Sequence, residues 1–390
     1  MGDRVSDVDW GPFLRTWSAE WIEALEPAEA EVFPEEARAA GWLGFAPATE
    51  ERIVALEERL GLRLPPSYRS FLAVSDGWRN VGEFIQSLGS TEQVGWFRDL
   101  SPQWCKTLIG IEDDAFHRGL YRRVLQISLE GDAAVLFLDP GRIDADGEWT
   151  AYFHASWTGD LPRKHADFAA LMRNEYRSFH RLRKPDNATS RAIEDQVERA
   201  RVACLAGAVD EPLAVFEEGS AFGRFRAELM RFQVHALLGN RDEARRAFGT
   251  ITRGDQDDPA WRALIAGELV PVFGALHRDE PMSALRRSIF ERELDELGER
   301  FGGEAEAAGE IAGEGSGTEG WRAAIAAARE SAVAGDDAAA WRIVSAGLAR
   351  WRPIGPDHVA PVALLADPVL GPLLTPERGR ELLGVPRAGR

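Results

Sequence analysis

The first forty residues carry apolar positions at helical spacing. Trp10, Phe13, Leu14, Trp17 and Trp21 recur three or four positions apart, which places them on one face of an α-helix. Because that face is rich in tryptophan, we expect the helix to dock on the domain that follows it. Residues 1–41 are therefore predicted to be an N-terminal Trp-rich helical extension.

Two further helices are predicted between residues 49 and 77. The first begins at Thr49, a residue type that caps helices, and ends at Gly61. The prolines at 65 and 66 separate it from the second helix, which ends at the turn formed by residues 76–77. The apolar positions of the two helices are Ile53, Leu56, Leu60, Tyr68, Phe71 and Leu72.

The spacing then becomes typical of strands. Residues 82–99 mix aromatic residues with Gly and Ser and suit short strands, and a short helix is expected over 101–113. Runs at 124–129 and 133–139 flank a Glu-Gly-Asp turn, which predicts a hairpin, and a third run covers 149–157. A helix is predicted over about 164–183. This order of elements is typical of an α+β domain with an antiparallel sheet.

Beyond residue 185 the pattern is helical. Residues 225–248 and 321–351 each join an apolar helix to an Ala-rich helix across a turn that contains glycine. The outline is similar to tetratricopeptide hairpins, but the strict period of about 34 residues is missing, so we expect a loose helical array. We divide it into a helical-hairpin region at 188–301, a Gly/Glu-rich linker at 302–319 and a C-terminal helical region at 320–390. The sequence leaves open whether these helices form one domain or two.

Charge and cysteine content limit the partners and the compartment. The net charge of −18 disfavours phosphate backbones and anionic lipid, so we expect no nucleic-acid or membrane partner and favour a basic protein. Many cytosolic proteins, however, are acidic only because charge keeps them soluble. Two distant cysteines, Cys105 and Cys204, cannot form a disulfide framework, and neither a leader nor a membrane-spanning run is visible. We therefore expect a cytoplasmic protein, and the preference for arginine over lysine indicates a bacterial source.

Motifs for catalysis, cofactors and metals are not found in the sequence. The seven histidines form no H-E-x-x-H or H-x-H pattern, and neither a Walker A nor a G-x-S-x-G motif occurs. The carboxylate pairs Asp113–Asp114 and Asp144–Asp146 fall in polar, turn-rich segments, which favours solvated loops. We predict no catalytic residue, no cofactor and no metal ligand. An enzyme stays an alternative only if distant carboxylates and histidines converge in the fold.

The stretch WLGFAPATEERIVALEERLGLRLPPSYRSFLAVSDGW, residues 42–78, resembles the opening of SUKH-superfamily domains, which include the Smi/Knr-type yeast cell-wall-assembly regulator. The pattern is an acidic amphipathic helix followed by L-P-x-x-Y/F-x-x-F-L-x-x-x-N/D-G. Two later features agree: the second run of the hairpin ends at Leu138–Asp139, and a helix follows Leu161–Pro162. The resemblance covers about 42–182, and we place a SUKH-like domain at 42–184. It implies a mostly antiparallel sheet flanked by helices, with no catalytic residues.

In bacteria such domains resemble immunity proteins, which bind and neutralise a cognate toxin. Our leading hypothesis is thus a non-enzymatic protein that covers the active site of a basic toxin. Tryptophans interleaved with acids in a Gly-rich stretch suggest a contact surface, because aromatic side chains often anchor protein interfaces. We predict that partner-binding residues are Trp78, Glu83, Trp96 and Asp99. The alternative is a scaffold or regulatory adaptor that binds partners through the C-terminal helical array.

Overall fold

The computed structural model describes residues 8–111, 119–158, 161–253, 258–277, 287–300 without 289, 293 and 298, and 319–387. The chain divides into two compact units, Met1–Asn187 and Ala188–Arg390. The predicted linker at 302–319 lies, except for Glu319, outside the described residues, as does the pair Asp113–Asp114. In the described part of the chain, no helix is long and apolar enough to cross a membrane.

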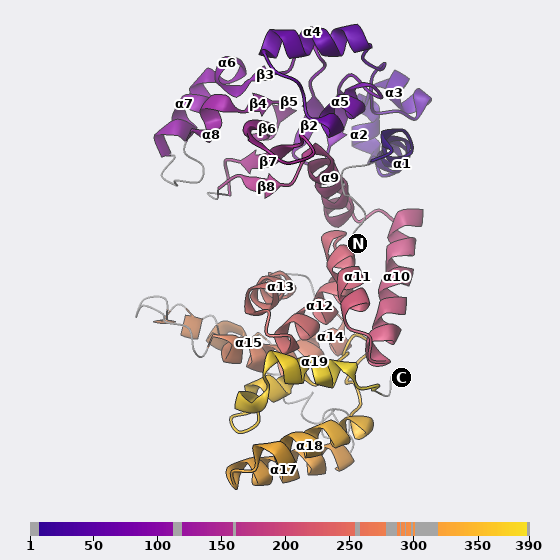
Figure 1. The fold of residues 1–390 in the computed structure, drawn as a ribbon. Coiled ribbons are helices and arrows are strands. Elements are labelled where there is room, and N and C mark those ends of the chain that lie inside the picture. Colours follow the sequence, from indigo (N-terminus) through magenta and orange to yellow (C-terminus); the bar gives the residue numbers. More distant parts are fainter. Residues whose placement is uncertain are drawn as a thin grey trace. The chain divides into compact units, whose positions relative to one another are not determined.

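The N-terminal unit contains two antiparallel sheets, as the α+β prediction requires (Figure 1). The three-stranded sheet has the order β1-β2-β5, with β1 Trp78–Val81, β2 Ile85–Leu88 and β5 Ser128–Gly131. The five-stranded sheet has the order β3-β4-β6-β7-β8. Its strands are β3 Gly95–Trp96, β4 Leu125–Gln126, β6 Ala134–Ile143, β7 Trp149–Ala155 and β8 Arg163–His165.

Nine helices are described around these sheets. Helix α9 packs against β1, β7 and β8, whereas α6, α7 and α8 gather at the end of the five-stranded sheet where β3 lies. The bounds are α1 Trp10–Glu23, α2 Pro27–Val32, α3 Glu35–Ala40, α4 Glu50–Leu60, α5 Pro66–Leu72, α6 Phe97–Leu100, α7 Pro102–Ile111, α8 Leu120–Arg123 and α9 Phe168–Arg183.

Two elements differ from the sequence prediction. The run at 124–129 is not one strand, because it divides at Ile127 into β4 of one sheet and β5 of the other. The last helix begins at 168 rather than 164, since residues 163–165 pair with β7 as strand β8. Asp167 caps this helix, and its Oδ1 accepts a hydrogen bond from the backbone N–H of Ala170 at 2.7 Å.

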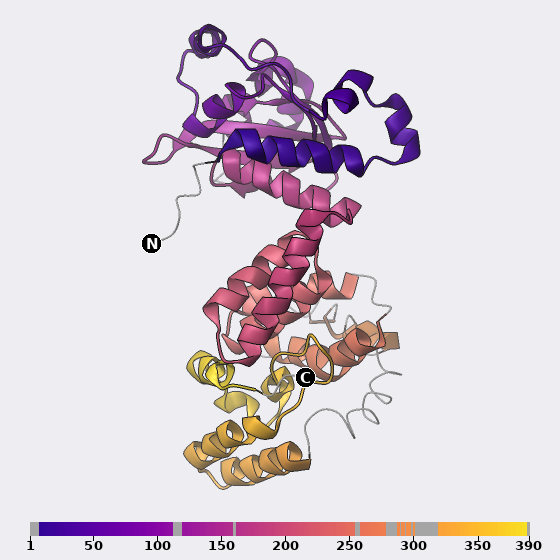
Figure 2. The same cartoon turned by 90° about the vertical axis from the view of Figure 1, so that its right-hand side faces the viewer.

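Helix α1 packs into the core of this unit along α9 (Figure 2). The Trp21 ring stacks on Phe179 with centroids 4.9 Å apart, and the Trp17 ring lies 5.4 Å from that of Tyr176. A buried carboxylate joins the two helices, because Glu20 Oε2 accepts a hydrogen bond from the Tyr176 hydroxyl at 2.5 Å. The apolar stripe of α1 is therefore covered by the following domain.

Every regular element described in the C-terminal unit is helical, which confirms the predicted helical-hairpin region. Sequence-adjacent helices pack in pairs, α10 with α11, α11 with α12, α12 with α13 and α17 with α18. The hairpin turns of α12–α13 and α17–α18 use Gly239 and Gly335 at φ +73° and +85°, a region that glycine adopts without strain. The described helices are α10 Ala188–Leu205, α11 Asp210–Ala221, α12 Phe225–Leu237, α13 Arg241–Arg253, α14 Pro259–Leu264, α15 Val270–Leu276, α17 Glu319–Val333, α18 Asp337–Gly347 and α19 Pro376–Gly384, with a π-helix at Ile265–Leu269 and short 3₁₀ turns at Leu348–Arg350, Val362–Ala366 and Gly371–Leu373.

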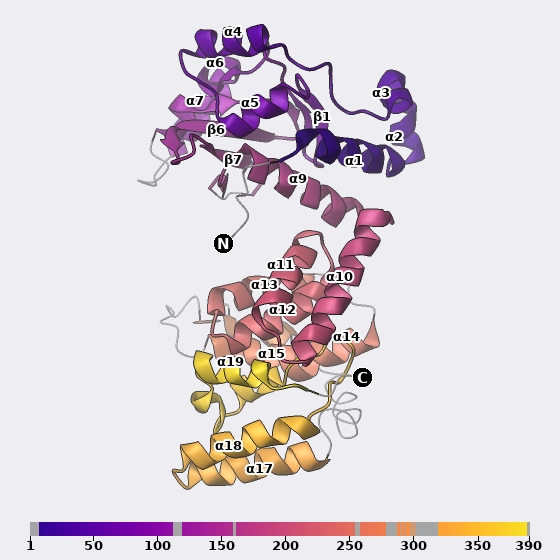
Figure 3. The same ribbon diagram turned by 45° about the vertical axis from the view of Figure 1, so that its right-hand side comes forward.

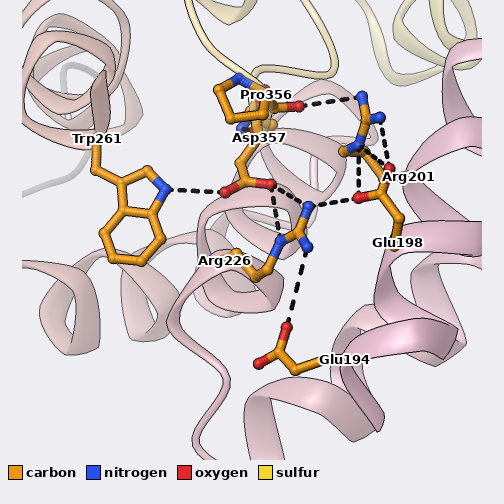
Figure 4. A network of polar contacts seen from close by, with 8 residues as sticks. Glu194, Glu198, Arg201, Arg226, Trp261, Pro356 and Asp357 are labelled. Atoms are coloured by element: carbon orange, nitrogen blue, oxygen red, sulfur yellow. Dashed lines mark hydrogen bonds and ion pairs between the residues drawn. The ribbon is translucent and has the colours of Figure 1, made fainter. Parts of the chain in front are cut away.

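Asp357 ties the C-terminal segment directly to α12 and α14, and through Arg226 to α10 (Figure 4). Its Oδ1 accepts hydrogen bonds from Arg226 Nε at 3.0 Å and Nη2 at 2.9 Å, and its Oδ2 accepts one from Trp261 Nε1 at 2.8 Å. Arg226 also donates to Glu198 Oε2 at 2.6 Å. Hydrogen bonds from Arg201 and Arg226 lower the pKa of Glu198 to about 2, so this network stays ionised at neutral pH. We interpret it as a structural junction because its charged groups bind one another.

Replacing Asp357 should loosen this junction. Asp357 is 3% exposed, so Asp357→Asn leaves Arg226 without its buried counter-ion and should cost about 3 kcal/mol. Hydrogen exchange in peptides from α14 and from residues 352–360 should then accelerate. Asp337→Asn, at an exposed position in the first turn of α18, is the matched control. Equal exchange in the two variants would contradict the structural role.

A buried carboxyl group makes the stability of the N-terminal unit depend on pH. Glu175 is 3% exposed and faces the turn between β1 and β2, where a Cβ at Gly82 would lie 2.7 Å from its Oε2. Burial raises the pKa of Glu175 from 4.5 to about 7.

The native unit therefore keeps a proton that the unfolded chain releases between about pH 4.5 and 7. Stability should fall by about 3 kcal/mol as the pH rises through this window, and Glu175→Gln should remove that fall. Hydrogen exchange in α9 peptides, measured as a function of denaturant concentration at pH 5 and pH 8, reports the stability of this unit alone. Glu175→Gln should increase the free energy of unfolding more at pH 8 than at pH 5. An equal increase at both pH values would show that Glu175 does not titrate in this range.

Candidate functional site

The structure separates the four residues predicted to bind a partner. Trp78 is 0% exposed, with its ring 5.2 Å from Trp42 and 6.1 Å from Trp17, so its prediction as a contact residue is wrong. It is the first residue of β1, and its side chain fills the core between that strand and α1. A buried indole cannot touch a partner without unfolding the unit.

The other three residues lie in two places. Glu83, in the turn between β1 and β2, forms an ion pair with Arg183 at 2.5 Å. Trp96 ends β3 of the other sheet, half-buried, with the Arg98 guanidinium 5.5 Å from its ring centroid. Asp99 is exposed in α6, and its carboxylate lies 3.9 Å from Arg98 Nε. Trp96 and Asp99 therefore stay proposed contact residues, while Glu83 is engaged in an ion pair within the protein.

A groove of about 930 Å³ lies over the three-stranded sheet. One wall comes from Leu25, Glu29 and residues 32–34. Most of these belong to the segment of residues 27–40, which is formed by α2 and α3 and is called the strap below (Figure 3). The opposite side comes from residues 45–46 and 90–93. Its exposed apolar side chains are Val32, Phe45 and Leu129, which are 84%, 39% and 37% exposed. Exposed apolar groups beside polar ones are typical of protein-binding surfaces.

Arg183 holds the strap in place. Its Nη1 and Nη2 donate hydrogen bonds to the two carboxylate oxygens of Glu29 at 2.7 and 2.8 Å, and its Nε donates to Glu83 at 2.5 Å. The guanidinium also lies 4.5 Å from the ring centroid of Trp21. The hydrogen bonds from Arg183 lower the pKa of Glu29, so the contact is an ion pair at neutral pH. One arginine thus joins α9, the strap and the β1–β2 turn.

The basic groups that line the groove are already bound within the protein. Arg52 contacts Asp76 at 2.8 Å and Glu92 at 3.2 Å. The Arg79 guanidinium lies 3.9 Å from the Phe45 ring centroid and donates a hydrogen bond to the Gly44 carbonyl at 3.1 Å. Two exposed carboxylates, Glu92 and Glu130, line the groove, and the adjoining strap carries three more exposed ones at Glu31, Glu35 and Glu36. The groove is therefore electrostatically suited to a basic partner.

The strap and Arg183 were not predicted from the sequence as parts of a site. One signal was present: Val32, Phe33 and Pro34 interrupt a run of glutamates, which is unusual for a helical core segment. The Arg183–Glu29 contact joins residues 154 positions apart, and no local pattern reveals it. In the part of the chain that the structure describes, no group of three or more His, Cys, Asp or Glu side chains is arranged to hold a metal ion.

Comparison with known proteins identifies the central part of the N-terminal unit. Residues 47–174 match the model of the SMI1 / KNR4 family (SUKH-1). This confirms the resemblance of the sequence to SUKH domains, and the C-terminal helices are not assigned to a family. No curated protein and no solved structure matches the chain. The matched range contains the sheet floor of the groove but excludes α1 and the strap, so the groove combines a family domain with helices that precede it.

Arg183→Ala should release the strap. The substitution leaves Glu29 and Glu83 without their cation and removes a stacked guanidinium from Trp21, which should cost about 2 kcal/mol because the site is partly solvated. Hydrogen exchange should accelerate in residues 27–40, while exchange in β6 and β7 should stay unchanged. Arg15→Ala, an exposed position on α1 of the same unit, serves as the control. Unchanged exchange in the strap of Arg183→Ala would show that the strap is held by other contacts.

Proposed function

We propose that this chain binds another protein through the groove of its N-terminal unit and neutralises a basic toxin by covering the toxin's active site. The observation that carries the proposal is the groove itself: a hollow of about 930 Å³ with exposed apolar side chains, rimmed by carboxylates whose neighbouring arginines are bound internally. The SUKH-1 match supports it, because SUKH domains in bacteria resemble immunity proteins.

The physical mechanism is occlusion, which needs no catalytic group on this chain. A toxin that cleaves nucleic acid has a basic cleft for its substrate, and an acidic surface competes for that cleft. Charge complementarity accelerates association, while buried apolar contacts slow dissociation. Val32 is the strongest anchor candidate because it projects from the strap with 84% of its surface exposed.

The helical unit supports a second candidate function, a scaffold or adaptor. A hollow of about 420 Å³ lies among its helices and is lined mainly by apolar groups, among them Leu237, Leu276, Leu365 and Leu374. An apolar recess in a helical array is suited to an apolar side chain of a partner.

The test mixes the full chain with purified basic toxins from its own genome, beginning with products of adjacent genes, and measures both complex formation and residual toxin activity. An equimolar amount of the chain should abolish the activity of the cognate toxin. Val32→Asp should weaken the complex about tenfold or more, because it places a charge at a buried apolar contact. Val333→Asp is the matched control, since Val333 also ends a helix and is 77% exposed, but lies in the helical unit.

Two outcomes would contradict the proposal. Equal binding by Val32→Asp and by the unsubstituted chain would show that the groove is not the contact surface. A complex that forms without lowering toxin activity, and that is weakened by Leu374→Asp instead, would favour the adaptor.

A further inference from the structure

We propose that the groove takes an extended segment of the partner and that a lysine or arginine side chain of this segment lies against Glu130. The inference rests on the proposed function and specifies what fills the groove.

The floor of the groove carries a polar row that crosses all three strands. Arg79 of β1 is paired with Ser87 of β2, and Ser87 is paired with Glu130 of β5. Directly paired residues of a regular antiparallel ladder lie on the same face, about 5 Å apart. The β2–β5 register shifts on both sides of the Ser87–Glu130 pair, so the shared face of these two residues rests on their common place in the groove lining. All three residues line the groove. The row therefore leads from a guanidinium at one edge of the sheet to a carboxylate at the other.

The two ends of this row differ in what they can bind. The Arg79 end is occupied, because its guanidinium contacts the Phe45 ring and the Leu43 and Gly44 carbonyls. Glu130, in contrast, is exposed at the opposite edge. An anion would meet a cation already bound within the protein, whereas a cation would meet an exposed carboxylate. The row thus selects a positive side chain at the Glu130 end.

The remaining lining favours an extended backbone over a helix. The strands of the floor also present amide and hydroxyl side chains, from Asn80, Gln86 and Ser87, which both donate and accept hydrogen bonds. An extended segment has unpaired N–H and C=O groups that need such partners, while a helix satisfies its own. Val32 and Phe45 offer apolar contacts on the two sides. An extended segment with alternating side chains can use the floor and the sides together.

The negative charge of the strap attracts a basic segment electrostatically. Glu31, Glu35 and Glu36 are exposed on it, against the single basic residue Arg38. Because the strap lies outside the residues that match the SUKH-1 family, its acidic residues add to the charge preference that Glu130 gives to the matched domain. Specificity would then come from Glu130 of the domain together with the helices that precede it.

Two labelled ten-residue peptides test the inference with the full chain. One repeats Lys, Thr and Val, and the other carries Glu at each Lys position. Fluorescence anisotropy should show saturable binding of the Lys peptide and none of the Glu peptide, at a physiological ionic strength of about 0.15 M that screens long-range attraction. Glu130→Lys should weaken binding about fivefold or more, and Val32→Asp should weaken it too.

Glu330→Lys is the control for non-specific attraction. Glu330 is exposed on α17 of the helical unit, and its replacement changes the net charge by the same amount as Glu130→Lys. Binding that survives Glu330→Lys but not Glu130→Lys supports the inference, provided that thermal melts of the two variants agree. Equal weakening by both variants, or no saturable binding of the Lys peptide, overturns it. If the toxin complex forms normally with Glu130→Lys and the Lys peptide does not compete, the occupant is wrong while the proposed function stands.

Discussion

The guanidinium of Arg183 is the contact on which the candidate site depends. It lies at the end of α9 and binds Glu29 of the strap and Glu83 of the β1–β2 turn while it stacks on Trp21 of α1. These groups come from α9, the β1–β2 turn, and the consecutive α1 and strap segments, so the contact joins three distant parts of the sequence. Without this contact the strap would have few buried side chains to hold it, since Ala37 is its single fully buried residue. The groove exists because one cation offsets two carboxylates at the place where these segments meet.

Helix α1 provides the second requirement, a rigid base for the strap. Its tryptophans fill space against α5 and α9, where the Trp10 ring lies 5.4 Å from both Phe71 and Phe168. Aromatic packing of this kind contributes both buried area and defined ring geometry. The strap continues directly from this helix and is therefore carried by the core of the unit, although its own residues are mostly exposed. The acidic residues of the segment can then face solvent, where a partner can reach them.

The sequence was informative wherever local chemistry determines structure. The helix over Glu50–Leu60 could be predicted because Thr49 caps it and Gly61 ends it in a left-handed conformation. The hairpin turns at Gly239 and Gly335 could be predicted because glycine marks positive φ. The prediction for Trp78 failed because alternation along a four-residue strand does not show which face is covered, and α1 covers the Trp78 face. The division of β4 from β5 depends on which strand each pairs with, which a single segment does not reveal.

The candidate site was the least predictable part for the same reason. Arg79, Ser87 and Glu130 look like ordinary polar residues of strands and turns, and their row exists only through the register of three strands. The family resemblance correctly predicted the domain that supplies this floor, but the matched residues do not include the strap. Long-range ion pairs and strand register can be identified only in the folded structure.

The most direct test of the groove as a protein-binding site is hydrogen exchange of the full chain with and without a cognate basic toxin. Binding in the groove should slow exchange in the strap and in β1, β2 and β5, and should leave α17 and α18 unchanged. Slowed exchange confined to the helices of the C-terminal unit, with the strap and the three-stranded sheet unaffected, would contradict the account.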